Sequence, residues 1–219
     1  MENRQLALPR SRPEAQGISS TAVKELFEAL HDRQLGIHSL MLLRNGFVVA
    51  EGWWAPYAEA YPHMLFSLSK SFTSTAVGFA VQEGLLSLDD PVVSFFPDEA
   101  PQKPSPNLSA MRIRHLLTMG SGHARDTMEV LERDDHWIQA FLDIPVEYEP
   151  GTRFVYNSGA TYMLSAIIQT VTGHKLLDYL RPRLLEPLGI MGATWQSCPR
   201  GIHTGGWGLS VTTEDIAKF

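Results

Sequence analysis

Ser67 and Lys70 form the pair of residues in this sequence whose types and spacing point most directly to chemistry. They read S-x-x-K within FSLSKSFTSTAVGFAVQEGLL. On a helix, a serine three residues before a lysine lies on the same face one turn away, so the amine can reach the hydroxyl. A serine hydroxyl is a poor nucleophile without an adjacent base, and a lysine can be that base in a dry pocket, where burial disfavours the charged form. The spacing therefore predicts acyl transfer through a covalent serine ester.

An isolated S-x-x-K is equally typical of a helix N-terminus at which Ser67 or Ser69 is the cap and Lys70 is solvated. The flanking residues argue against that alternative. Apolar residues precede the motif, and the helix behind it is rich in small and apolar residues, namely Phe72, Ala76, Val77, Phe79, Ala80 and Val81. A helix of this kind is buried and would carry Lys70 inward. Since buried lysines are rare without a partner, we predict a functional role for Lys70.

A second candidate constellation is Tyr156, Asn157 and Ser158, in PGTRFVYNSGATYMLSAIIQTVTG. A tyrosine just before a buried helix, with two polar side chains beside it, could face a cleft and relay a proton to a leaving group. The alternative is structural, with Asn157 or Ser158 capping the helix and Tyr156 packing as an aromatic side chain. The residues alone leave both interpretations open.

Composition limits the classes of function. The chain has 219 residues, of which 44% are hydrophobic and 19% charged, so it can bury a core as one large or two small domains. A net charge of −6 argues against binding to nucleic acid. The one cysteine, Cys198, excludes an intramolecular disulfide. No stretch has the character of a signal peptide or membrane span, so we expect a cytoplasmic protein without a membrane partner.

The elements that must position these residues fall into two groups. Residues 1–66 are expected to contain a helix over Thr21–Gln34, capped by Ser19 or Ser20, and two strands, Ile37–Leu43 and Phe47–Trp54. Asn45-Gly46 between the strands predicts a hairpin. Residues 67–219 are expected to be mainly helical and to carry both motifs, with helices near 69–84, 112–119, 134–143, 158–172, 175–187 and 212–219.

The hairpin needs covering, because two strands alone are marginally stable in water. No later segment predicts several further strands, and the sequence stops at Phe219 within a helical pattern. We therefore expect that C-terminal strands completing an antiparallel sheet are missing. An exposed, apolar sheet edge promotes pairing with another chain, so we also expect self-association through the incomplete sheet.

Several segments in order resemble the beta-lactamase-related serine hydrolases, which include class C beta-lactamases, D-alanyl-D-alanine carboxypeptidases and related esterases and amide hydrolases. The resemblance extends from Ile37 to Phe219 through LFSLSKSF, GLLSLDDPVVSFFP, IRHLLTMGSGH, EPGTRFVYNSGATYMLSAII and GGWGLSVTTEDIAKF. It implies an α/β (α+β) fold of the beta-lactamase and penicillin-binding-protein type, with an antiparallel sheet region and a mainly helical region.

The resemblance also implies roles for individual residues. Ser67 matches the acylated nucleophile, Lys70 its basic partner and Tyr156 the tyrosine of the family motif Y-x-N. Ser158 stands where the family has asparagine, so either Asn157 or Ser158 is the expected substrate contact. The backbone N–H of Ser67 would form half of the oxyanion hole.

The family's third motif, K-T-G or H-x-G, lacks an evident match. His203-Thr204-Gly205 reads H-T-G, but its surroundings resemble a family loop that precedes a late helix. We expect the third motif beyond Phe219 and retain His203 as a secondary candidate for substrate binding. The histidines lack metal-ligand spacing, and no metal or cofactor is expected.

The favoured function is hydrolysis of a small ester or amide through an acyl-serine on Ser67, activated by Lys70 and Tyr156. Two alternatives stay open at this point. One is a non-catalytic member of the fold that binds a ligand or a partner, and the other is an inactive truncated fragment.

Overall fold

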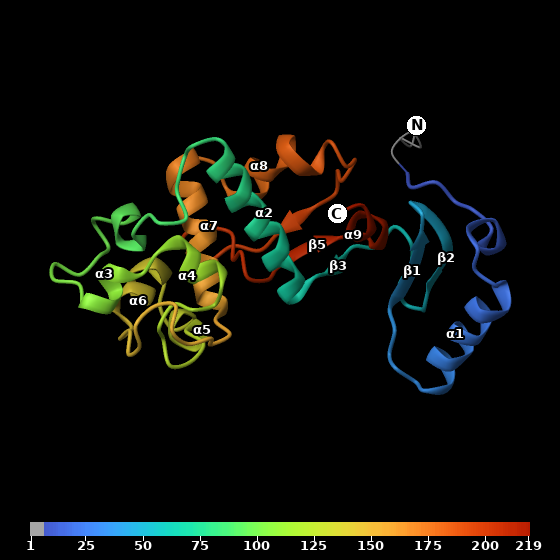
Figure 1. The fold of residues 1–219 in the computed structure, drawn as a ribbon, viewed down its shortest axis with the longest axis horizontal. Helices are drawn as coiled ribbons and strands as arrows, with labels where there is room; N and C mark the ends of the chain where they lie inside the picture. Colours follow the sequence, from blue (N-terminus) through green and yellow to red (C-terminus); the bar gives the residue numbers. More distant parts are fainter. Residues whose placement is uncertain (1–6) are drawn as a thin grey trace. The chain divides into compact units, whose positions relative to one another are not determined.

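The computed structural model describes residues 7–219 (Figure 1). The chain divides into two compact units. The first comprises the chain up to His63 together with Leu185–Ala193 and Ser210–Phe219, and the second comprises Met64–Leu184 and Thr194–Leu209. Sequence analysis expected a division at 66/67 and did not anticipate that two later segments belong to the first unit.

The first unit is built around the hairpin. It contains the 3-10 helix η2 (Pro13–Gln16), α1 (Ser20–Asp32), β1 (Ser39–Arg44), β2 (Phe47–Trp53) and α9 (Thr213–Lys218). The Ser19 side chain caps α1 by accepting a hydrogen bond from the Thr21 N–H, as predicted. Asn45 and Gly46 turn the hairpin with φ values of 52° and 78°, which is the conformation that Asn-Gly favours.

The two edges of this hairpin have different neighbours. The free side of β2 meets the N-terminal segment, since Val48 N–H donates to the Pro9 carbonyl at 2.8 Å and Ser11 N–H donates to the Val48 carbonyl at 3.0 Å. Within residues 7–219, β2 is the one strand that pairs with β1. α9 packs against β1.

The second unit is mainly helical, as predicted. Its helices are α2 (Ser69–Gln82), α3 (Pro106–Ala110), α4 (Ile113–Leu117), α5 (Met128–Leu131), α6 (Trp137–Asp143), α7 (Ser158–Thr172) and α8 (Leu176–Leu180), with 3-10 helices η3 (Phe66–Leu68) and η4 (Val92–Phe95) and a π-helix η5 (Arg181–Leu185). Residues 159–168 of α7 are all buried, so α7 is the centre of the core. α2, α4, α6 and α8 pack around it (Figure 1).

A second, small sheet has the strand order β3-β5-β4, with β3 at His63–Met64, β4 at Thr194–Trp195 and β5 at Leu209–Val211. Sequence analysis predicted no set of further strands after the hairpin, and this sheet of three short strands corrects it. The strands have two or three residues each, too few for alternation of apolar and polar residues to be visible. The short helices α3 and α5 escaped prediction for the same reason.

In the part of the chain from residue 7 onward, no helix combines the length and the apolar character needed to cross a membrane.

Candidate active site

Ser67 lies at a sharp turn between β3 and α2. Phe66, just before it, has a φ of 45° in the left-handed region, which costs a non-glycine residue about 1–2 kcal/mol. Ser67 itself belongs to the 3-10 helix η3, and Lys70 lies in the first turn of α2. The helix predicted near 69–84 is α2, and Ser67 lies just before it in η3. The one-turn relation survives, because residues three apart also align in a 3-10 helix.

Three predicted residues meet at the Ser67 hydroxyl. Tyr156 Oη lies 2.7 Å and Lys70 Nζ 3.2 Å from Ser67 Oγ. Lys70 Nζ also donates to Ser158 Oγ at 3.3 Å and to the Gly206 carbonyl at 2.8 Å. These three acceptors match the three N–H groups of an ammonium. Lys70 is half-buried. It is therefore not fully solvated, but it is less deeply buried than the apolar character of the helix led us to expect.

Tyr156 is 47% exposed and carries a perturbed phenol. Burial acts to raise its pKa, but hydrogen bonds with Ser67 and Lys70, together with the positive charge of Lys70, lower it further than burial raises it. Lys70 Nζ lies 4.9 Å from the centre of the Tyr156 ring. The pKa of Tyr156 is therefore below its ordinary value, which makes the phenolate more accessible.

Asn157 and Ser158 take different positions. The Asn157 side chain is fully buried and caps α7, where its Oδ1 accepts from the Ala160 N–H at 3.2 Å and from Thr127 Oγ1 at 2.8 Å. This placement does not fit the predicted substrate contact by Asn157 and matches the structural alternative. Ser158 joins the Lys70 cluster, and its backbone N–H donates to Asp126 Oδ1 at 3.0 Å.

His203 lies away from the Ser67 cluster. Its Nδ1 accepts from the Leu177 N–H at 3.2 Å, and its ring stacks on Trp195 with the ring centres 6.0 Å apart. Burial lowers its pKa to about 4. His203 thus packs as a neutral side chain, which does not fit the predicted role in substrate binding.

The residues that follow His203 supply a contact that sequence analysis missed. The Gly206 carbonyl accepts from Lys70, and the Gly205 carbonyl accepts from Thr73 Oγ1 at 2.7 Å. A Cβ on Gly205 would lie 2.8 Å from the Cβ of Ser165 in α7. In the sequence, the pair Gly205-Gly206 was the one feature that pointed to this close approach, because glycine is favoured where backbone segments must lie close to other atoms.

Comparison with known proteins decides the family. The family model described as Beta-lactamase matches residues 23–219. The chain belongs to this family.

Three similar proteins show how far the likeness extends. A lovastatin esterase of Penicillium rubens is 27% identical over 151 residues, covering 58% of this chain and 37% of the esterase. A putative D-alanyl-D-alanine carboxypeptidase of Escherichia coli is 23% identical over 224 residues, covering 89% of this chain and 52% of the relative. The solved structure of a putative 6-aminohexanoate-dimer hydrolase from Bacillus anthracis has a TM-score of 0.76 at 22% identity, covering 89% of this chain and 55% of that one.

The fold expected from the resemblance is thereby confirmed. The chain spans 37% to 52% of the length of these two curated relatives.

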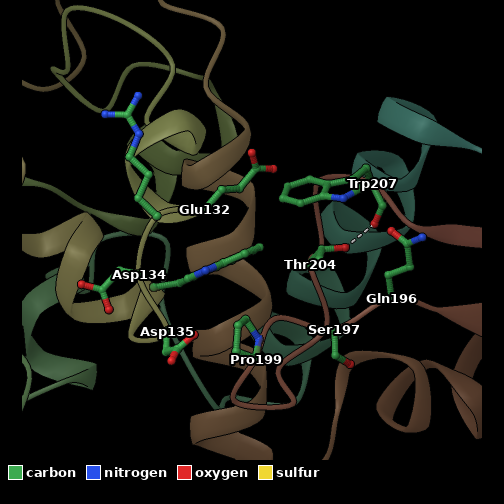
Figure 2. Close-up of a pocket in the computed structure, with 10 residues that line it drawn as sticks. Glu132, Asp134, Asp135, Gln196, Ser197, Pro199, Thr204 and Trp207 are labelled. Atoms are coloured by element: carbon green, nitrogen blue, oxygen red, sulfur yellow. Dashed lines mark hydrogen bonds between the residues drawn. The ribbon is translucent and has the colours of Figure 1, made fainter.

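This Beta-lactamase-family chain has no group of three or more potential metal ligands among residues 7–219. It does have a pocket of about 480 Å³ in the second unit (Figure 2). Carboxylates from Glu132, Asp134 and Asp135 lie on one side and Thr204 and Trp207 on the other. Ser67, Lys70 and Tyr156 do not line this pocket.

Proposed function

We propose that this chain carries the acylation centre of a serine hydrolase that cleaves an ester or an amide through an acyl-serine intermediate on Ser67. The observation that carries the proposal is the convergence of Tyr156 Oη and Lys70 Nζ on Ser67 Oγ, at 2.7 Å and 3.2 Å. Nucleophile and base within hydrogen-bond reach are the signature of covalent catalysis. The similarity to a lovastatin esterase and to a putative D-alanyl-D-alanine carboxypeptidase supports this reaction class.

The acylation step follows from the hydrogen bonds. The phenolate of Tyr156, stabilised by the Lys70 ammonium, takes the proton from Ser67 as Oγ bonds to the substrate's carbonyl carbon. The carbonyl π electrons move onto oxygen, where the Ser67 backbone N–H can stabilise the charge. Collapse of this intermediate breaks the C–O or C–N bond, and Tyr156 returns its proton to the leaving alcohol or amine. Water then attacks the acyl-serine by the same path and releases the acid.

Ser158 is our candidate for the polar contact to substrate. Its hydroxyl lies 3.3 Å from Lys70 Nζ, whereas the Asn157 side chain is buried in the cap of α7. A serine is shorter than the asparagine usual in the family, so its contact reaches less far from the backbone.

Covalent labelling tests the proposal. The chain is treated with a fluorophosphonate, and the modified peptide is identified by mass spectrometry. We expect the adduct on Ser67 and none in Ser67→Ala. Ser69 is the matched control, because it is buried and its Oγ accepts a hydrogen bond from the Leu209 N–H at 3.3 Å. An adduct on Ser69, or no adduct on a folded chain, would refute the acylation centre and favour a non-catalytic binding role.

A further inference from the structure

Asp126 connects the starts of two helices in the second unit. Its Oδ1 accepts a hydrogen bond from the N–H of Ser158, the first residue of α7, at 3.0 Å. The same oxygen accepts from the N–H of Met128, the first residue of α5, at 3.1 Å. The first N–H groups of a helix have no acceptor within that helix, so Asp126 supplies one at each start. A single carboxylate oxygen thereby links the beginning of α7 to the segment that leads into α5.

This link extends to the Lys70 cluster through Ser158. Ser158 Oγ lies 3.3 Å from Lys70 Nζ, which in turn lies 3.2 Å from Ser67 Oγ. The hydroxyl of a serine is one bond beyond Cβ, so the backbone and a single torsion angle determine where it lies. By holding the Ser158 N–H, Asp126 restricts the positions open to the Ser158 hydroxyl that Lys70 contacts.

Asp126 also carries a charge that no close partner neutralises. The residue is half-buried, and within residues 7–219 it forms these two hydrogen bonds and no ion pair. The other charged groups around the pocket that it lines belong to Arg125, Arg133, Asp134, Asp143 and Glu147. Arg133 pairs with Glu129, outside this pocket, at 2.5 Å. The negative charge of Asp126 therefore acts on the N-terminus of α7, where it complements the helix dipole.

Tyr156, which directly precedes the cap of α7, lies within range of this charge. Burial raises the pKa of Tyr156, and hydrogen bonds with Ser67 and Lys70 lower it. Two charged groups act in addition, since the Lys70 ammonium on α2 lowers the pKa and the Asp126 carboxylate raises it. A group that takes a proton and later returns it works best with a pKa near the operating pH. Lys70 and Asp126 thus adjust the Tyr156 phenol in opposite directions.

We propose that Asp126 is a positioning residue of the acylation centre, which holds the start of α7 so that Ser158 Oγ faces Lys70 and which places a negative charge near the Tyr156 phenol. Its effect on catalysis rests on the acyl transfer proposed for Ser67. Its contacts with the backbone of α7 and its effect on Tyr156 do not depend on that reaction. Asp126 acts through Ser158 and Tyr156, and it is not itself a catalytic residue.

Nuclear magnetic resonance tests Asp126 without any reaction at Ser67. Asp126→Asn keeps an acceptor oxygen but loses the charge, so the titration midpoint of Tyr156, followed by ¹³C at Cζ, should move to lower pH. Asp126→Ala loses the acceptor as well, so the Ser158 amide should exchange its proton faster than in Asp126→Asn. Asp143→Asn is the matched control, because it removes an exposed carboxylate at the end of α6 that lines the same pocket. It should shift the Tyr156 midpoint less than Asp126→Asn and leave the Ser158 exchange unchanged.

The pH dependence of fluorophosphonate labelling connects these effects to catalysis. If the Tyr156 phenolate is the base, the labelling rate rises with pH as Tyr156 ionises, and this rise should move to lower pH in Asp126→Asn together with the midpoint. Asp126→Ala should label about tenfold or more slowly than Asp126→Asn, the change expected from losing one hydrogen bond to a charged group. Asp143→Asn should label like the parent. If Asp126→Ala does not fold, Asp126→Asn still tests the charge through both measurements.

The outcomes separate this proposal from the acylation centre itself. Either an unmoved Tyr156 midpoint in Asp126→Asn or an unchanged Ser158 exchange rate in folded Asp126→Ala would overturn the role of Asp126, even if Ser67 is labelled. If the parent chain is not labelled while both magnetic resonance results are as expected, the acyl transfer is refuted and the positioning by Asp126 is supported.

Discussion

Tyr156 and Lys70 share one acceptor, the hydroxyl oxygen of Ser67, and Lys70 also lowers the pKa of Tyr156. The Lys70 charge helps to lower the pKa of Tyr156, while Lys70 Nζ has acceptors for three N–H groups. At the scale of single residues, this arrangement suits a division of labour. In the mechanism proposed above, Lys70 would provide the positive charge and Tyr156 would move the proton.

Substitution of Lys70 tests that division. Lys70→Ala removes the charge that favours the Tyr156 phenolate, so it should slow acylation of Ser67 by roughly 10²–10⁴-fold, the range typical of impaired general base catalysis. Lys70→Arg keeps the charge, so it should label measurably faster than Lys70→Ala, although a planar guanidinium fits the three acceptors poorly. The measurement is the rate of fluorophosphonate labelling in folded variants. Equal rates in the two variants would show that a positive charge at this position is not by itself sufficient for acylation.

The titration of Tyr156 can be followed without activity. In a chain with ¹³C at the tyrosine Cζ, we expect Tyr156 to ionise below the ordinary pKa of about 10. Lys70→Ala removes a hydrogen bond and a positive charge that both favour the phenolate, so the midpoint should move to higher pH. Tyr61, exposed and outside this cluster, serves as the internal control. A Tyr156 midpoint that does not respond to Lys70→Ala would contradict the coupling.

At the scale of elements, the N-terminus of α7 organises the site. Asn157 caps this helix while Tyr156 precedes it and Ser158 begins it. The capping residue thus lies between the two residues that hydrogen-bond to Ser67 and Lys70. The cap also holds Thr127, whose N–H and hydroxyl both donate to Asn157 Oδ1.

Removal of this cap should destabilise the fold more than removal of an ordinary one. Asn157→Ala loses the cap and leaves buried donors of Thr127 and Ala160 unpaired, so we expect a loss of about 2–4 kcal/mol in unfolding free energy. Ser19→Ala removes the exposed cap of α1 and should cost about 1 kcal/mol or less. Urea denaturation measures both. Equal losses would show that the Asn157 network adds nothing beyond capping.

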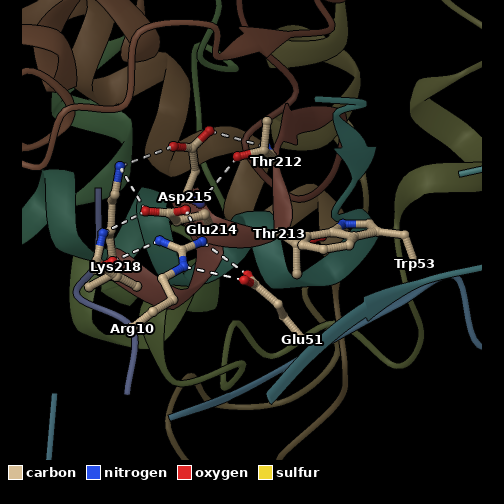
Figure 3. A network of polar contacts seen from close by, with 9 residues as sticks. Arg10, Glu51, Trp53, Thr212, Thr213, Glu214, Asp215 and Lys218 are labelled. Atoms are coloured by element: carbon tan, nitrogen blue, oxygen red, sulfur yellow. Dashed lines mark hydrogen bonds and ion pairs between the residues drawn. The ribbon is translucent and has the colours of Figure 1, made fainter. Parts of the chain in front are cut away.

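Arg10 joins three elements of the first unit (Figure 3). Its Nη2 lies 2.9 Å from Glu51 of β2 and 2.7 Å from Glu214 of α9. Glu214 also accepts from the Leu8 N–H at 2.6 Å. Burial raises the pKa of Glu214, but the bonds from Arg10 and Leu8 lower it further. Arg10 thus ties the N-terminal segment to α9.

Arg10→Lys should loosen this tie, because a single ammonium cannot span two carboxylates as a guanidinium does. We expect faster hydrogen exchange at Leu8 and in α9, with a stability loss of about 1 kcal/mol or less, since the pair is partly exposed. Lys24→Arg, at an exposed pair with Glu28 on α1, is the control and should change neither quantity. Unchanged exchange in α9 would refute the tie.

At the scale of the whole molecule, two buried histidines make stability depend on pH. Burial lowers the pKa values of His123 and His203 to about 4, below the value of about 6.5 expected in the unfolded chain. Between these values the unfolded chain binds more protons, so stability is complete above pH 6.5 and is lost as the pH falls towards 4.

We therefore expect the unfolding free energy to fall between pH 7 and pH 5, by up to about 1.4 kcal/mol per pH unit for each histidine. Urea denaturation followed by tryptophan fluorescence measures it. His203→Asn retains an acceptor for the Leu177 N–H but does not titrate here, so its pH slope should be shallower. A slope unchanged by this substitution would exclude His203 as a source.

The sequence by itself determined the hairpin and the helical character of the second unit, and its spacing indicated Ser67 and Lys70 as candidate site residues. For Tyr156 the residues left a structural role equally open, and the family resemblance selected the catalytic one. These features follow from local physics: Asn-Gly adopts left-handed φ values, helix periodicity shows in the sequence, and a three-residue spacing sets one turn. The roles of Asn157 and Ser158 could not be separated, because both side chains can cap a helix and only packing selects one.

Tertiary structure alone decided the contacts between distant segments. The Gly206 carbonyl reaches Lys70 from 136 positions away, and backbone atoms carry no side-chain chemistry that a sequence pattern could reveal. His203 and His123 are buried and neutral because the core closes around them. The sequence His203-Thr204-Gly205 reads the same whether the histidine lies in the core or in a substrate site. The strands β3, β4 and β5 have two or three residues each, so no alternation of apolar and polar residues could reveal them in the sequence. Pairing between distant segments, and not local preference, holds them in place.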